Sequence, residues 1–368
     1  MRILKLLLVP LITLFACQEE GNNLTPENET NELYFPPITG DTWAKTSPEA
    51  LGWNTSAIPA LLSFVEVQDS RAFIVLKNGK IVIEEYFGQA VNGGAFNKDS
   101  FWYWASAGKT LKATLAGTAQ EEGYLSINDA VSKYLGAGWT NLAQEEEEKI
   151  TIKHQLTMTS GLDDFVENSN CTTPECLQFK AAPGSRWAYH NAPYTLLSDV
   201  LAKATNQTFE NYFEEKIADP IGMNGFWQMN NFNQIFWSNA RSMARFGILI
   251  LNEGTWDDTP ILSDTEFYQA MISPSQTMNE SYGYFWWLNG KNSHMLPALQ
   301  TKFSGSICPN APEDMYAAIG KNGQIICVVP SQELIVIRMG DAKQNQSGAP
   351  VDILDDIWVE LNNVMPSQ

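Results

Sequence analysis

The chain has 368 residues, of which 44% are hydrophobic and 18% charged, the balance of a globular protein with one large or two ordinary domains. Acidic residues outnumber basic ones by 42 to 23, and the formal net charge is −19. Because nucleic-acid binding depends on a surface rich in lysine and arginine, this charge excludes DNA and RNA as expected partners.

The N-terminal residues have the features of an export signal. Residues 1–5 include two basic side chains, and residues 6–16 form an apolar run that is too short to cross a bilayer as a helix. The run ends just before Cys17, an arrangement that resembles a bacterial lipoprotein signal, in which cleavage precedes a cysteine that is then lipidated. We predict a signal peptide over residues 1–16 and a lipid anchor at Cys17, which holds an exported protein at the periplasmic or cell-surface face of a membrane. An ordinary secretory signal with a chance cysteine is the alternative.

A polar segment follows the predicted anchor. Residues 17–45 are rich in Glu, Asn, Thr and Pro, a composition typical of a flexible tether. The folded domain is therefore predicted over residues 46–368.

Four cysteines remain after the predicted anchor. An even number in an oxidising compartment suggests two disulfides, for which three pairings exist. We favour Cys171 with Cys176, around a short loop, and Cys308 with Cys327 across neighbouring strands. The three histidines do not cluster with cysteine in the sequence, so no metal site is expected.

The predicted elements place strands at both ends of the domain and helices between them. A hairpin is expected around the Asn78-Gly79 turn, and helical periodicity dominates the segment that follows. The expected elements are a hairpin over residues 71–87, a helical lobe over about 106–280, strands over 316–319, 324–329 and 334–339, and a closing helix over 350–363. This order predicts an α+β fold, in which an antiparallel sheet built from both chain ends is flanked by helices and faces a mainly helical second lobe. A site is expected in a cleft between the lobes.

A serine and a lysine lie three positions apart in F-W-Y-W-A-S-A-G-K-T, residues 101–110. On a helix this spacing puts Ser106 and Lys109 on one face, where a lysine with a lowered pKa can take the serine proton. The start of a helix favours both the neutral amine and an oxyanion. A solvated helix start is the alternative, because such a pair also arises by chance.

A second cluster follows at Tyr189-His190-Asn191, just before a predicted helix. A tyrosine beside the serine–lysine pair could carry a proton to the leaving group, and the Asn191 amide could hold both Lys109 and a substrate carbonyl. A surface tyrosine followed by a helix-capping asparagine is the alternative reading.

Several longer stretches add to these two clusters, and together they resemble the serine β-lactamase-related superfamily. This superfamily includes penicillin-binding proteins, class C β-lactamases, related esterases and 6-aminohexanoate-dimer hydrolases. The stretches are G-Y-L-S-I-N-D-A-V-S-K-Y-L from Gly123, I-T-I-K-H-Q-L-T-M-T-S-G-L from Ile150, A-P-G-S-R-W-A-Y-H-N from Ala182, I-A-D-P-I-G-M from Ile217 and A-R-S-M-A-R-F-G-I-L-I-L-N-E-G from Ala240.

The resemblance implies a β-lactamase/transpeptidase-like fold and a role for each motif residue. Ser106 would be the acylated nucleophile, Lys109 its base and Tyr189 a second proton carrier. Asn191 would orient Lys109 and the substrate. The oxyanion hole would use the Ser106 N–H and a second N–H from a strand near Lys321.

The third motif of this superfamily, Lys-Thr-Gly or His-x-Gly, has no direct counterpart in Y-A-A-I-G-K-N-G-Q, residues 316–324. In the register we prefer, the motif is Ala318-Ile319-Gly320 and Lys321 supplies the oxyanion N–H. In the other, the motif begins at Lys321 and Gln324 supplies the N–H. With Ala318 in place of the cation, a substrate carboxylate loses a charge-assisted partner worth about 1.5–3 kcal/mol, which favours neutral esters or amides.

The sequence therefore predicts an envelope-anchored serine hydrolase that acts through an acyl-enzyme on a small-molecule or short peptide-like ester or linear amide. A β-lactamase or D,D-peptidase and a non-catalytic anchored binding protein of the same fold are the alternatives. No cofactor is expected, because a nucleophile, a base and an oxyanion hole are enough for this chemistry.

Overall fold

The computed structural model describes residues 32–341 and 350–366. Backbone contacts divide the chain into Met1–Glu32 and one compact unit, Leu33–Gln368. The predicted signal peptide, Cys17 and the first half of the predicted tether lie outside the described residues. Within the described ranges, no helix is both long enough and apolar enough to cross a membrane.

A six-stranded antiparallel sheet joins the two ends of the compact unit, as predicted. Its strand order is β2-β1-β13-β12-β11-β8. Strand β1 pairs with β2 and with β13, so an N-terminal hairpin lies beside a C-terminal one. Asn78 and Gly79 both have positive φ, the conformation that the predicted turn requires. The strands are β1 (Ser70–Lys77), β2 (Lys80–Tyr86), β8 (Trp287–Leu288), β11 (Tyr316–Gly320), β12 (Gln324–Val329) and β13 (Leu334–Gly340).

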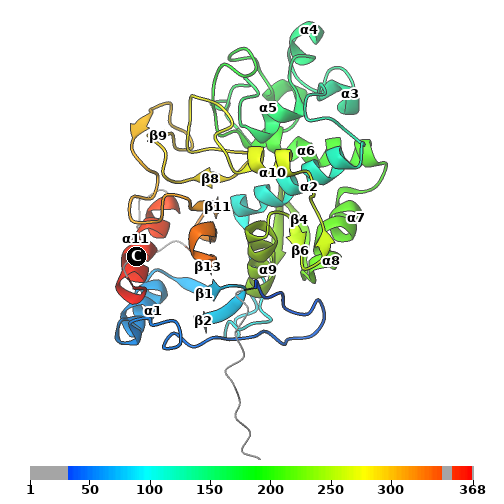
Figure 1. Cartoon of the computed structure of the whole chain (residues 1–368). Coiled ribbons are helices and arrows are strands. Elements are labelled where there is room, and N and C mark those ends of the chain that lie inside the picture. Colours follow the sequence, from blue (N-terminus) through cyan, green and yellow to red (C-terminus); the bar gives the residue numbers. More distant parts are fainter. Residues whose placement is uncertain (1–31, 342–349, 367–368) are drawn as a thin grey trace, which may run out of the picture. The chain divides into compact units, whose positions relative to one another are not determined.

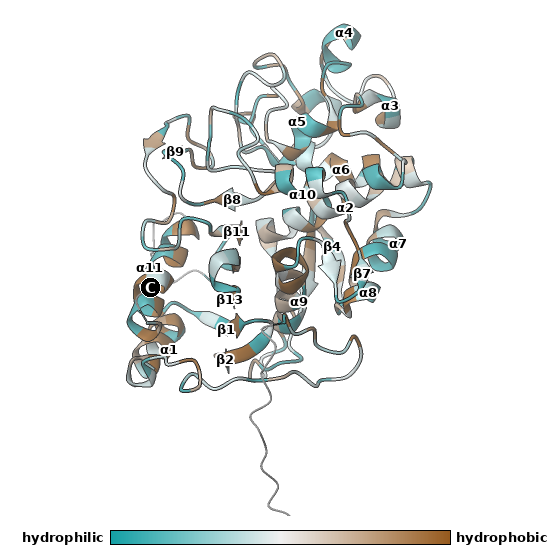
Figure 2. Ribbon diagram, in the orientation of Figure 1, coloured by the Kyte–Doolittle hydropathy of each residue, from teal (hydrophilic) through white to brown (hydrophobic). Residues whose placement is uncertain are grey.

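Helices cover both faces of this sheet. Helices α1 (Ile58–Val67) and α11 (Pro350–Val364) pack together, and α9 (Ala240–Leu251) packs against β12 and β13. In Figure 1 the sheet lies between the red and blue pair α11 and α1 and the green α9. Strands β12 and β13 in the middle of the sheet are consequently buried along their whole length, and α9 is largely brown in the hydropathy colouring of Figure 2.

The mainly helical lobe lies beyond the sheet and also contains a small sheet. Strands β3, β5 and β4 pair in that order, and this three-stranded sheet was not predicted from the sequence. The main elements of the lobe are its three-stranded sheet, β3 (Trp102–Tyr103), β4 (Gly225–Asn230) and β5 (Asn233–Ser238), and the helices α2 (Lys109–Glu121), α5 (Ile152–Leu156), α6 (Asn191–Thr205), α7 (Phe209–Phe213) and α10 (Thr265–Met271). The shorter elements of the unit are α3 (Ser132–Leu135), α4 (Gln144–Glu147), α8 (Asp219–Ile221), β6 (Thr255–Trp256), β7 (Thr259–Pro260), β9 (Ser293–His294) and β10 (Phe303–Ser304).

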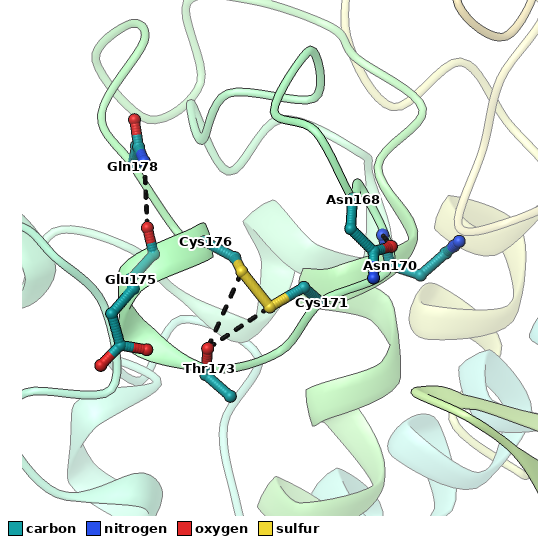
Figure 3. The surroundings of a disulfide bond; sticks show 7 residues. All are labelled: Asn168, Asn170, Cys171, Thr173, Glu175, Cys176 and Gln178. Carbon is teal, nitrogen blue, oxygen red and sulfur yellow. Dashed lines mark hydrogen bonds between the residues drawn. A yellow bond between two sulfur atoms is a disulfide. The ribbon is translucent and has the colours of Figure 1, made fainter.

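One of the two predicted disulfides is present. Cys171 and Cys176 are bonded, and the Thr173 hydroxyl lies 3.3 Å from the Cys171 sulfur (Figure 3). The predicted pair Cys308–Cys327 is wrong, since both cysteines are free and buried. Cys327 lies in β12, whose neighbours are β11 and β13, and Cys308 belongs to neither of these strands. The two cysteines therefore do not lie on neighbouring strands, as the prediction required.

Candidate active site

Ser106 lies on a sharp turn between a strand and a helix. Strand β3 ends at Tyr103, a 3₁₀ turn covers Ala105–Gly108, and α2 begins at Lys109. Ala105 has φ of 47°, a left-handed conformation that costs a non-glycine residue energy and often occurs at functional turns. The turn is held in place because the Trp104 indole is fully buried and donates to the Ser238 hydroxyl at 2.7 Å. Ser106 is thereby presented at the start of α2.

The Lys109 amine lies within hydrogen-bond distance of Ser106. Its Nζ lies 3.0 Å from Ser106 Oγ, as the spacing on the helix predicted. Burial lowers the pKa of Lys109 to about 7, because the amine has left water and no carboxylate compensates its charge. The Tyr194 and Tyr189 rings surround the amine at 4.1 and 5.1 Å from their centroids. A large share of Lys109 is therefore a free amine near neutral pH.

Tyr189 completes the group around the serine. Burial raises the pKa of its phenol, and the interaction with Ser106 offsets only part of this rise. The ring stacks on Trp287, with centroids 6.0 Å apart, and meets Tyr282 edge-on. A phenol held in this way stays protonated at neutral pH and can donate a proton to a leaving group.

Asn191 lies next to the site but has a different partner from the one expected. It is the first residue of α6, and its amide nitrogen donates to Asn170 Oδ1 at 2.8 Å. Its amide oxygen is buried without a hydrogen-bond partner among the described residues. The bond to Asn170 was not predicted, and the proposed contact of Asn191 with Lys109 stays a prediction.

The end of β11 forms the wall opposite Ser106. A Cβ atom on Gly320 would lie 2.4 Å from the Trp104 carbonyl oxygen and 3.0 Å from the Ala107 nitrogen, so only glycine fits. Ala318 is buried inside the same strand, whereas Ile319, Gly320 and Lys321 line the cavity beside the serine. The strand therefore brings its last residues to the nucleophile.

The hairpin turn that follows favours the first of the two registers of the third motif. Asn322 donates to the Tyr103 hydroxyl at 2.7 Å and to Asp341 at 2.9 Å. Gly323 has positive φ and packs against the Arg338 guanidinium. Neither residue lines the cavity. If the motif began at Lys321, its second and third residues would therefore lie in the turn and not beside Ser106.

The cavity itself is small and mainly apolar. It has a volume of about 200 Å³, and its polar groups are those of Ser106, Tyr189, Gly320 and Lys321. The other lining residues share an apolar character and are Trp287, Leu296, Pro297, Ile307, Ile319 and Val351. In the part of the chain that the structure describes, no three His, Cys, Asp or Glu side chains are arranged to hold a metal ion.

One ionisable residue beside the site, Lys112, was not predicted from the sequence. It lies one helical turn after Lys109 and is fully buried. The available signal was the repeated three-residue spacing from Ser106 to Lys109 to Lys112, which places all three on one face of a helix. Because lysine on a helix is usually solvent-exposed, the spacing alone did not indicate that Lys112 is buried.

Comparison with known proteins shows the family to which this chain is related. The Beta-lactamase family matches residues 67–355. A candidate penicillin-binding protein, PbpX of Bacillus subtilis, is 30% identical over 174 residues, which are 44% of this chain and 43% of the relative. The match thus spans less than half of that relative. An uncharacterised protein of Alkalihalophilus pseudofirmus is 24% identical over 74% of this chain and 84% of its own length.

Solved structures show the same fold. A candidate 6-aminohexanoate-dimer hydrolase from Bacillus anthracis has a TM-score of 0.65 at 16% identity and covers 90% of this chain and 89% of its own. A class C beta-lactamase from Rhodobacter sphaeroides has a TM-score of 0.60 at 15% identity, with 84% of this chain and 99% of its own covered. With the family match over residues 67–355, the chain belongs to the Beta-lactamase family and has the β-lactamase/transpeptidase fold.

Proposed function

We propose that this protein hydrolyses an ester or a linear amide through an acyl-enzyme formed on Ser106. The observation that carries the proposal is the 3.0 Å contact between the buried Lys109 amine and the Oγ of Ser106, which lines an apolar cavity. Family membership supports a serine hydrolase, and the positions of Ser106, Lys109 and Tyr189 support their proposed roles as nucleophile, base and second proton carrier.

The reaction follows from these positions. Neutral Lys109 takes the hydroxyl proton while Ser106 Oγ attacks the substrate carbonyl carbon. The backbone N–H groups of Ser106 and Lys321 donate to the oxyanion, and each such donor is typically worth about 10²–10³ in rate. Tyr189 gives its proton to the departing alcohol or amine and regains one from Lys109. Water then attacks the acyl-enzyme and restores Ser106 by the same steps in reverse.

The cavity favours an uncharged, apolar acyl group. Its walls are almost entirely apolar, and Ala318, at the motif position where a cation would face a substrate carboxylate, is buried and uncharged. Placing a carboxylate against such walls without a partner would cost free energy. A short or branched acyl chain of an ester or amide suits this volume.

A β-lactamase or D,D-peptidase is the second candidate, and one observation favours it. The exposed Lys321 lies at the cavity, where its ammonium could meet a carboxylate from the rim. Among the relatives, AmpH of Escherichia coli is described as a D-alanyl-D-alanine-carboxypeptidase/endopeptidase and is 29% identical over 32% of this chain and 34% of its own.

The proposal places the enzyme outside the cytoplasm, anchored through Cys17. Support comes from the sequence of residues 1–17 and from the Cys171–Cys176 disulfide, a bond that persists in oxidising compartments. Metabolic labelling with a clickable fatty acid tests the anchor. Wild type should be labelled and Cys17→Ser should not, whereas equal labelling of both would contradict it.

The activity is tested with two chromogenic substrates. Purified full-length protein is incubated with p-nitrophenyl butyrate and, separately, with a chromogenic cephalosporin, beside Ser106→Ala. We expect ester turnover that disappears in Ser106→Ala, with little cephalosporin cleavage. Dominant cephalosporin cleavage would support the second candidate, and equal ester turnover by both proteins would refute Ser106 as the nucleophile.

A further inference from the structure

Three half-buried side chains outside the cavity form a closed hydrogen-bond ring, and the proposed mechanism does not use them. The Asn322 amide nitrogen donates to the Tyr103 hydroxyl at 2.7 Å and to Asp341 Oδ1 at 2.9 Å. The Tyr103 hydroxyl in turn donates to the same Oδ1 at 2.9 Å. Burial raises the pKa of Tyr103 to about 12, so the phenol keeps the proton that it donates. Each member of the hydrogen-bond ring is therefore bonded to the other two.

The hydrogen-bond ring joins the two chain segments that carry the proposed oxyanion donors. Tyr103 ends β3, three residues before Ser106, and Asn322 directly follows Lys321. Trp104, which lies between Tyr103 and Ser106, is fully buried, and its backbone N–H is bonded to β5. Because such a tightly packed segment transmits strain, a shift of Tyr103 would be passed on to Ser106. One contact between side chains thus links the neighbourhoods of both N–H groups.

The third member fixes the hydrogen-bond ring to the large sheet. Asp341 follows β13, and its backbone N–H donates to the Asp69 carbonyl at 3.0 Å. The fully buried Arg338 guanidinium donates to the carbonyl of Asp341 at 3.2 Å. It also donates to the carbonyls of Asn322 at 2.8 Å and Gly323 at 2.7 Å. The sheet therefore holds both the acceptor side chain and the backbone of the turn.

An oxyanion hole depends on the separation of its two donors, because both N–H groups must point at one oxygen. Gly320 packs so closely against the backbone of Trp104 and Ala107 that no Cβ fits there, which prevents the two segments from moving closer. The hydrogen-bond ring supplies an attraction that opposes their separation. A misplacement of about 1 Å can cost about 10²-fold in rate, so this restraint bears on catalysis.

We propose that Tyr103, Asn322 and Asp341 are positioning residues for the oxyanion hole. Their hydrogen-bond ring holds the backbone N–H groups of Ser106 and Lys321 at the separation that one substrate oxygen requires. The inference rests on the proposed function, in which these two N–H groups stabilise the oxyanion. None of the three side chains lines the cavity, so they act on the transition state through the backbone and not on the binding of the substrate.

The test removes one side chain of the hydrogen-bond ring at a time from the full-length protein. Tyr103→Phe deletes the hydroxyl and keeps the aromatic group, which stacks on Trp102 with centroids 5.5 Å apart. Asn322→Gly deletes the amide and suits the φ of 65° at this position. Tyr134→Phe is the matched control, because the half-buried Tyr134 donates its hydroxyl to the Asp129 carboxylate at 2.6 Å and does not line the cavity.

We expect kcat for p-nitrophenyl butyrate to fall about tenfold or more in Tyr103→Phe and in Asn322→Gly, with KM within about twofold of wild type. Acylation and deacylation both pass through an oxyanion, so both rates fall together. KM depends on the ratio of these rates and therefore changes little. Tyr134→Phe should keep the wild-type kcat, although it loses a comparable hydrogen bond.

A transition-state analogue gives a readout that a loss of stability would not change. Propane-1-boronic acid carries the alkyl group of the butyrate ester. The Ser106 oxygen bonds to boron, the serine proton passes to Lys109, and no group leaves, so that one oxygen of the tetrahedral boronate occupies the oxyanion hole. Its inhibition constant should rise about tenfold in Tyr103→Phe and Asn322→Gly, in parallel with the fall in kcat, and stay unchanged in Tyr134→Phe.

Asp341 supplies a conservative variant. Asp341→Asn keeps Oδ1 as an acceptor and should retain kcat within about threefold, whereas Asp341→Leu should lose about as much as Tyr103→Phe. Tyr103 and Asn322 also allow a coupling test. Because they act through one bond, the double variant Tyr103→Phe/Asn322→Gly should lose about as much kcat as either single variant.

Three outcomes overturn the inference, and they are distinguishable. If Tyr103→Phe and Asn322→Gly keep the wild-type kcat and inhibition constant while their melting temperatures fall, the hydrogen-bond ring only stabilises the fold. An equal loss of kcat in Tyr134→Phe would show that the effect is not specific to the oxyanion hole. If wild type neither hydrolyses the ester nor binds the boronic acid, the proposed function fails and this inference fails with it. Should Tyr103→Phe not fold, Asn322→Gly removes the same bond from its other side.

Discussion

The amide nitrogen of Asn191 donates to Oδ1 of Asn170 across 2.8 Å, and this bond links the start of α6 to the residue just before the disulfide-closed loop. That loop runs from Cys171 to Cys176, and Asn170 immediately precedes it (Figure 3). The bond fixes which end of the Asn191 amide is engaged, and it leaves the buried amide oxygen free to accept from an ammonium or a substrate N–H. A residue outside the cavity thus sets the orientation of a motif side chain.

Replacing Asn170 tests this orientation. In Asn170→Leu the Asn191 amide loses its partner and can rotate, so we expect kcat/KM for the ester to fall about 5- to 10-fold, the worth of one hydrogen bond. Asn170→Asp keeps an acceptor at the same place and should lose less. Steady-state kinetics with thermal unfolding as a control separate this effect from a loss of folding. A leucine variant with wild-type kinetics would show that the bond has no role.

Gly320 should tolerate no side chain. A Cβ there would meet the Trp104 carbonyl oxygen and the Ala107 nitrogen, both backbone atoms beside Ser106. Gly320→Ala must therefore push β11 away from the nucleophile, and we expect a loss of about 10² or more in kcat from a displaced oxyanion hole. Gly94→Ala is the matched control, because only the Asn92 side chain lies near its added Cβ. Equal activity of the two variants would contradict the tight approach.

The activity should depend on pH through Lys109. Its pKa is about 7 in the folded protein, and only the neutral amine can accept the serine proton. We expect kcat/KM to rise about tenfold per pH unit below pH 7 and to level off above it. A rate profile against pH with the chromogenic ester measures this limb. A profile that is flat from about pH 5 to 8 would show that another group is the base.

The same pKa makes a prediction about stability. Lys109 has a pKa of about 7 when folded, against about 10.4 for a lysine in an unfolded chain. Between these values the unfolded state binds more protons, so the free energy of unfolding rises with pH through this window. Lys109→Met removes this dependence and should raise the melting temperature near neutral pH by about 2–4 °C or more while abolishing activity. The difference between the two proteins should shrink as the pH approaches 10, and a constant difference would contradict this origin.

Reduction of the Cys171–Cys176 bond should lower both stability and activity. A disulfide around so short a loop is worth about 2 kcal/mol, and its loss would also loosen Asn170. We expect dithiothreitol to lower the melting temperature and kcat/KM of wild type and to have no further effect on a Cys171→Ala/Cys176→Ala variant. Cys308→Ala, which removes a free cysteine, should respond to reductant as wild type does. If dithiothreitol changes neither the melting temperature nor kcat/KM of wild type, the disulfide does not support the site.

Much of the fold was predictable because its signals are local. The Asn78-Gly79 turn between two apolar runs marks a hairpin, and the Ser106–Lys109 spacing depends only on helix geometry. Strand β3 has only two residues, so its pairing with β5 leaves almost no pattern in the sequence. The free Cys308 and the bond from Asn191 to Asn170 depend on how distant loops pack. Lys112 was missed because its burial is decided by rings from α6, α7 and β4.

The pairing of β1 with β13 has a consequence for when the domain can fold. Ser70 lies opposite Gly340 and Lys77 opposite Leu334, so the centre of the sheet needs residues from both ends of the domain. A nascent chain has no β13 until synthesis is almost complete, and closing such a long loop makes folding slow. The polypeptide thus remains without its central sheet for nearly all of translation, the unfolded state that the proposed export would need.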